Sequence, residues 1–190
     1  MNVFGGSGQC LELSNGGTEV FIDVLMLAVS ELADGEWDYR FAALLALQDQ
    51  NVMGRGAVGF DLEDIAWGAS AAERARAKDF VLRTVALALN RHRWDELGED
   101  LPFARDHLLR FHSMVESFLP TGSAPLGDGF PSPEERAVAS CARHRVLSAW
   151  PHWEGCFLCH RQGTGQGSTA GSYFPRTPCF SSALRSARTA

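Results

Sequence analysis

The segment SAAERARAKDFVLRTVALALNRHR, residues 70–93, carries the plainest structural signal in the chain. Ser70 and Glu73 have the spacing of a capping box, in which each side chain accepts a hydrogen bond from the other residue's backbone amide. The cationic end, from Arg91 to Arg93, suits the negative end of a helix dipole. The segment therefore predicts a helix from Ser70 to about Arg93. Its expected buried stripe, spaced by three or four residues, is Ala77, Phe80, Val81, Val85, Ala88 and Leu89.

Three other segments have the periodicity of helices. Residues 18–33, with Thr18 as the expected cap, end at Asp34-Gly35, where glycine suits a left-handed exit. Residues 38–50 are so apolar that they are expected to be buried. A further helix is expected after Pro102, because proline suits the first helical position. These segments predict a mainly α fold, a single helical domain with one or two short strands.

The two expected strands lie in glycine-rich surroundings. One covers residues 10–13, ahead of the turn signal Asn15-Gly16. The other lies within 57–65 and follows a G-x-G-x-x-G pattern that runs from Gly54 to Gly59. A dinucleotide site needs a strand before that pattern, whereas a helix is expected here. The pattern is therefore interpreted as a loop that leads into a strand, and whether it binds anything is left open.

Three carboxylates, Asp61, Glu63 and Asp64, occupy the second expected strand. In a strand, Asp61 and Glu63 would share one face and Asp64 would point away. The simplest interpretation is a solvated acidic face, and an acidic contact surface is expected there. A metal-dependent enzyme is a further alternative, which would require these carboxylates and His92 to converge around an ion.

A second signal of a different kind lies near the C-terminal end, where Cys141 and His144 precede Cys156 and Cys159. Zinc takes thiolate and imidazole ligands in a tetrahedron, and two closely spaced pairs of ligands form such a cage. Closed four-ligand sites are usually structural rather than catalytic. These four residues are therefore predicted to bind zinc in a hairpin. The pattern resembles the zinc knuckles and ribbons of many unrelated proteins, so it indicates no particular family.

Alternatives remain for this cluster. His152 or His160 can replace His144 as the fourth ligand, and His152 is the better placed of the two. A disulfide within Cys156–Cys159 would indicate redox chemistry, but the βαβ pattern that usually accompanies it is missing. Cys141 and His144 can also be ordinary buried residues at a helix end, because free cysteine is often a core residue.

The charge of the chain is unevenly distributed. Of its 17 basic residues, four lie in residues 161–190, which hold no acidic residue, so residues 1–160 carry 13 basic and 23 acidic residues and a formal charge of −10. Such an acidic body repels phosphate backbones and makes nucleic-acid binding unfavourable. A basic protein is the partner that this charge suits.

Composition and segment lengths give the expected organisation. Residues 1–119 are expected to form the helical core domain, 120–131 a linker or loop, 132–160 a short helix plus the Cys3His zinc hairpin, and 161–190 a disordered tail. The short helix is expected to begin with a capping box formed by Ser132 and Glu135 and to end near Cys141. The N-terminus lacks the pattern of a signal peptide, and the most apolar segment is too short to span a bilayer. A cytoplasmic protein without a membrane span is therefore expected.

Three functions are compatible with these features. The first is a non-enzymatic binding or regulatory protein with structural zinc and an acidic contact surface, as in an immunity protein or antitoxin. The second is a zinc-ribbon protein associated with nucleic acid, because Arg143, Arg145 and Arg161 flank the cluster. The third is the metal-dependent enzyme that would use Asp61, Glu63, Asp64 and His92. No sequence motif names a substrate or an oligomeric state.

Overall fold

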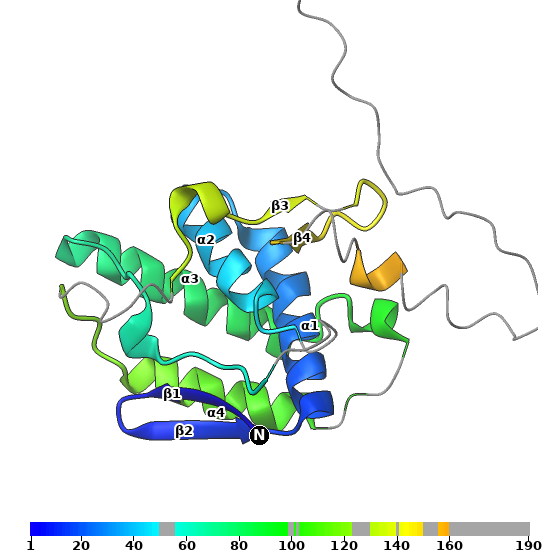
Figure 1. Cartoon of the computed structure of the whole chain (residues 1–190), viewed down its shortest axis with the longest axis horizontal. Coiled ribbons are helices and arrows are strands. Elements are labelled where there is room, and N and C mark those ends of the chain that lie inside the picture. Colours follow the sequence, from blue (N-terminus) through cyan, green and yellow to red (C-terminus); the bar gives the residue numbers. More distant parts are fainter. Residues whose placement is uncertain are drawn as a thin grey trace, which may run out of the picture.

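The computed structural model describes residues 1–49, 56–98, 101, 103–122, 130–139, 141–149 and 156–159. Helices dominate these residues, as the mainly α prediction requires, and two small antiparallel sheets accompany them at opposite ends of the molecule (Figure 1). The α-helices are α1 (Asn15–Leu32), α2 (Glu36–Ala46), α3 (Ala71–Leu89) and α4 (Ala104–Ser117). None of the described helices is long and apolar enough to cross a membrane.

Helix α3 begins where the sequence predicts, because Ser70 and Glu73 form both hydrogen bonds of the capping box. The predicted end at Arg93 is wrong, since the helix ends at Leu89. The backbone turns into the left-handed region at Arg91 and again at Arg93, with φ of 59° and 58°. This turn leads into the 3-10 helix η2 (Trp94–Leu97) and directs Arg93 away from the helix axis.

Helix α1 begins earlier than the sequence predicts. The Ser14 side chain accepts a hydrogen bond from the Gly17 amide and is the N-cap, so Thr18 is not the cap. Asn15-Gly16, which predicts a turn, instead forms the first helical turn. The buried Thr18 hydroxyl accepts a hydrogen bond from the Asn2 side chain, and this bond joins the start of α1 to the first strand.

Gly35 does not provide the predicted left-handed exit from α1, because its φ is −116° and it is the N-cap of α2. A Cβ at this position would lie 2.7 Å from the Arg76 guanidinium. That guanidinium makes two hydrogen bonds to Asp38, whose side chain is 1% exposed. The carboxylate also accepts from the amides of Asp34 and Gly35, so its burial is compensated by hydrogen bonds and a cation.

The N-terminal sheet is a hairpin of β1 (Asn2–Gly6) and β2 (Gln9–Leu13), so the strand expected at 10–13 has a partner that the sequence did not reveal. The strand predicted within 57–65 is wrong in most of its length. Residues 58–60 run beside β1 through two backbone hydrogen bonds, and a 3-10 helix, η1 (Leu62–Asp64), follows. A Cβ at Gly59 would lie 1.6 Å from the Val3 carbonyl oxygen, so this close approach requires glycine.

The C-terminal part of the described chain also differs from the prediction. Ser132 and Glu135 form the predicted capping box, but the short helix stops after one 3-10 turn, η3 (Pro133–Glu135). A second hairpin follows, in which β3 (Val138–Ala139) pairs with β4 (Leu147–Ser148). The Ala137 amide donates to the Tyr39 carbonyl, and the Arg40 side chain donates to the Pro131 carbonyl. These bonds hold the segment against α2.

The buried apolar residues form one continuous cluster that extends from Phe4 to Leu158. Its centre is aromatic, with the Phe21 ring edge-to-face against both Phe4 and Phe111 at centroid distances of 5.2 Å and 5.5 Å. Helix α1 lies in the middle of this cluster and contacts α2, α3 and α4 (Figure 1). The predicted boundaries at residues 119 and 132 stay predictions.

Candidate metal centre

The four predicted ligands come from two short pieces of chain, which together form the Cys/His segment, residues 141–149 and 156–159. Cys141 and His144 lie in the turn that connects β3 to β4, which the Arg145 amide closes by donating to the Cys141 carbonyl at 2.8 Å. The sequence predicted a helix that ends near Cys141, and this part is wrong, whereas the predicted hairpin is present. Cys156 precedes a single helical turn, residues 157–159, and Cys159 lies within it.

The four side chains converge on one point. Their ligand atoms, three Sγ atoms and the His144 Nδ1, all lie within 4.8 Å of one another. Cys141, His144 and Cys156 are buried, whereas Cys159 is partly exposed. His144 Nδ1 lies 3.7 Å from the Sγ of Cys141, 3.3 Å from that of Cys156 and 3.4 Å from that of Cys159. Four Cys and His side chains in this arrangement can hold a metal ion.

These separations match the edges of a small coordination tetrahedron. Zinc bonds of about 2.3 Å to sulfur and about 2.0–2.1 Å to nitrogen place two sulfurs about 3.8 Å apart, and a sulfur and a nitrogen about 3.5 Å apart. The Sγ atoms of Cys141 and Cys159 are 3.8 Å apart, which is also far beyond the S–S bond length of about 2.05 Å. The described cysteines are all free thiols.

The protonation of the three thiols also bears on metal binding. Burial, followed by the neighbouring Cys141 and Cys156 side chains, raises the pKa of the Cys159 thiol to about 12. Burial also raises the pKa of the Cys156 thiol. At Cys141 burial acts in the same direction, but hydrogen bonds from the His144 and Arg143 amides outweigh it and lower the pKa. Deprotonation of all three thiols would therefore require a cation between them.

Two groups outside the cluster hold its loop in position. The Arg93 guanidinium, directed by the left-handed turn after α3, donates to the His144 carbonyl and forms an ion pair with Glu96. Hydrogen bonding to Glu96 raises the pKa of Arg93, and the same contact lowers the pKa of Glu96. On the other side, the Leu147 amide donates to the Ser30 hydroxyl of α1 at 2.9 Å. The loop is thus attached to two helices of the core.

The structure brings His144 into the cluster, whereas the alternative ligands His152 and His160 lie outside the described residues. Gly54 also lies outside them. Sequence reasoning missed Arg93 and Ser30, because nothing in their local sequence indicates a partner 51 or 117 positions away. The capping pattern around Ser132 indicated a longer helix than the one 3-10 turn that forms, and the pairing of β3 with β4 gives the predicted hairpin its strands.

The set proposed for an enzyme, Asp61, Glu63, Asp64 and His92, does not gather around a common point. Within the described ranges, the Cys/His cluster is the one group of three or more such side chains with the spacing of a metal site. Glu63 accepts from the Ser7 amide, while His92 lies 3.9 Å from Glu31 of α1. Partial burial, followed by repulsion from Asp64 and Glu63, raises the pKa of Asp61. The three carboxylates are therefore close enough to interact with each other.

No protein-family model, curated protein or solved structure matches this chain. The class of the protein therefore follows from its fold and its site, a mainly helical domain that carries a Cys3His cluster with the geometry of a metal centre.

Proposed function

We propose that this chain is a non-enzymatic binding or regulatory protein whose Cys/His segment is shaped by a structural zinc ion. The observation that carries the proposal is the closed set of four protein ligands, whose atoms lie within 4.8 Å of one another. A catalytic zinc usually keeps one position open for water or substrate, whereas four protein ligands fill the tetrahedron. The ion would therefore stabilise the segment rather than activate a water molecule.

The donor set supports zinc over other ions. Three thiolates and one imidazole are soft or intermediate donors, which suit zinc and not magnesium or calcium. An ion with two positive charges would also stabilise the three thiolates at neutral pH. The cytoplasm, where thiols are kept reduced, is the compartment that suits such a site.

The binding role is supported by charge. The acidic balance of residues 1–160 favours a basic protein partner and opposes the backbone of a nucleic acid. An immunity protein or antitoxin is one concrete form of such a role. The alternative, a zinc-ribbon protein on nucleic acid, requires salt-sensitive binding to RNA or DNA. A gel-shift titration that shows such binding would favour this alternative.

Metal analysis tests the zinc site. Purified, reduced protein is expected to contain about one zinc per chain by plasma mass spectrometry, and a Cys156→Ser, Cys159→Ser double variant is expected to contain almost none. Cys10→Ser is the matched control, because Cys10 is an exposed cysteine on β2 outside the cluster, and it should retain the full content. Absence of zinc from reduced wild-type protein would contradict the proposal.

A further inference from the structure

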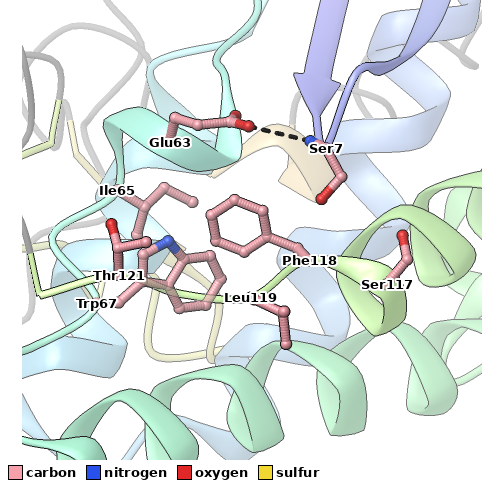
Figure 2. A pocket seen from close by; sticks show the side chains of 8 residues that line it. All are labelled: Ser7, Glu63, Ile65, Trp67, Ser117, Phe118, Leu119 and Thr121. Atoms are coloured by element: carbon pink, nitrogen blue, oxygen red, sulfur yellow. Dashed lines mark hydrogen bonds between the residues drawn. The ribbon is translucent and has the colours of Figure 1, made fainter.

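A small pocket lies far from the Cys/His cluster, between the β1–β2 turn, the segment around η1 and the end of α4. Figure 2 shows Glu63 and Ser7 along one side of it, the Phe118 ring in the middle, and Ile65 and Trp67 on the other side. The rest of its lining is Ser117, Leu119 and Thr121. Its volume is about 270 Å³.

The size of this pocket limits what it can accept. Sites for cofactors and drug-sized molecules typically enclose about 300–1,000 Å³, so this pocket is at or below the lower end of that range. A single amino-acid side chain is a better match for a space of this size. Anchor side chains inserted into such pockets often supply much of the binding energy of a protein interface.

The walls combine apolar surface with one carboxylate. Ile65, Trp67 and Phe118 are buried in the core, and the side chain of Leu119 is 79% exposed beside them. Trp67 is held in place by the hydrogen bond from its Nε1 to the Leu62 carbonyl. Leu119 therefore supplies the exposed apolar surface of the lining, which an apolar stem can contact.

Charge selects the kind of side chain that can enter. Glu63 lies on the rim, and none of the eight lining residues is basic, while the neighbouring Lys78 ammonium is engaged by the Glu116 and Phe118 carbonyls. One Glu63 oxygen accepts from the Ser7 amide at 3.0 Å, which fixes the position of the carboxylate at the pocket. Asp61 and Asp64 add negative charge close to Glu63, because the Asp61 carboxylate interacts electrostatically with both Glu63 and Asp64. The pocket is therefore complementary to a cation with an apolar stem.

We propose that this pocket receives an arginine side chain from a basic protein partner, with the guanidinium at Glu63 and the aliphatic stem against Trp67, Phe118 and Leu119. Arginine is preferred to lysine because its planar guanidinium matches a carboxylate and packs against aromatic rings. The inference rests on the proposed function, and it places the acidic contact surface at Asp61, Glu63 and Asp64.

The test uses the zinc-loaded full chain and a displayed library of random linear peptides as the probe. Peptides selected on the wild-type protein are expected to be enriched in arginine beside an apolar residue. Glu63→Gln is expected to weaken their binding about tenfold, because it removes the charge but keeps an oxygen for the Ser7 amide. Leu119→Ser, a change at an exposed side chain, is expected to weaken binding by a smaller factor.

The control is Glu134→Gln, which removes the same charge from an exposed residue on η3. It should leave the affinity of the selected peptides unchanged. Nuclear magnetic resonance of the wild-type chain with one such peptide should shift the signals of the Ser7 amide and the Trp67 indole.

Three outcomes would overturn the inference in different ways. If selected peptides are basic but bind Glu63→Gln as tightly as the wild type, the pocket assignment fails and the proposed basic partner remains. If selection gives no basic peptides, the proposed partner class fails together with the pocket. If Glu63→Gln and Glu134→Gln weaken peptide binding equally, binding reflects general charge attraction and the pocket assignment fails.

Discussion

The helical body, residues 1–49, 56–98 and 103–122, and the Cys/His segment are stabilised in different ways. The body buries whole aromatic and aliphatic side chains from each of its α-helices, among them Phe21, Phe41, Phe80 and Phe111. The Cys/His segment contributes few apolar anchors, chiefly Val146, Leu147 and Leu158. Its other buried side chains include three of the four clustered residues, Cys141, His144 and Cys156. One region depends on apolar burial, and the other depends on directional bonds.

This difference has a physical basis. Apolar burial is non-directional and is shared over many contacts, so the body tolerates the loss of any one hydrogen bond. A short segment with two two-residue strands cannot bury enough apolar surface to offset its conformational entropy. Four ligands around one ion would supply the missing free energy at a single point.

The largest expected effect comes from removing the metal. A strong chelator added to the zinc-loaded protein should disorder the Cys/His segment and leave the helical body folded, because structural zinc contributes on the order of 10 kcal/mol. Amide hydrogen exchange should become fast in residues 141–149 and stay slow in α3. If α3 loses its protection at the same chelator concentration, the two regions form one cooperative unit and the comparison is wrong.

A cavity in the helical body should have the opposite effect to metal removal: it should destabilise the body more than it weakens zinc binding. Phe111 is fully buried and packs edge-to-face with Phe21 and Phe60. Phe111→Ala is expected to lower the free energy of unfolding by about 3–5 kcal/mol, measured by urea denaturation. The exposed Phe103→Ala is the control and should change it by less than about 0.5 kcal/mol. If Phe111→Ala changes the free energy of zinc binding by more than the free energy of unfolding, the two regions are coupled more closely than proposed.

The contact between the two regions can be weakened selectively at Ser30. Ser30→Ala removes the acceptor of the Leu147 amide and leaves a partly buried donor unsatisfied, at an expected cost of about 1–2 kcal/mol. The cost should appear as faster hydrogen exchange in residues 146–148 and as a lower zinc affinity. An unchanged exchange rate there would show that the ligands alone position the loop.

The smallest expected effect is a dependence on pH within the body. Burial lowers the pKa of His107, with a smaller contribution from Arg110 and an opposing one from Asp106. The unfolded chain therefore takes up this proton first, and stability should decline as the pH falls below about 6.5, until the folded pKa is passed. His107→Gln should reduce the decline by about 0.5 kcal/mol or less, because the imidazole is partly exposed.

Urea denaturation at a series of pH values between about 7.5 and 5 measures this effect. His112→Gln, a change at a partly buried histidine on the same helix, shows what losing a histidine does by itself. An identical pH profile for wild type and His107→Gln would contradict the assignment.

The sequence predicts some parts of this protein well because their causes are local. The capping boxes at Ser70 and Ser132 act within three residues, and both form as predicted. The helical periodicity of residues 70–89 reports a buried face regardless of what covers it. The misplaced start of α1 has a cause beyond its neighbours. Ser14 and Thr18 are both good caps, and the Thr18 hydroxyl is instead used by Asn2 of β1.

The amino-acid sequence by itself determined the helical class, the acidic balance and which four Cys and His residues cluster, because periodicity, charge and Cys/His spacing are properties of neighbouring residues. Only the tertiary structure decided which distant residues meet. Arg93 reaches the His144 carbonyl, Ser7 holds Glu63 at the pocket, and Gly59 allows its chain to approach β1. The physical reason is that packing brings these groups together across many residues, and no local pattern specifies such contacts.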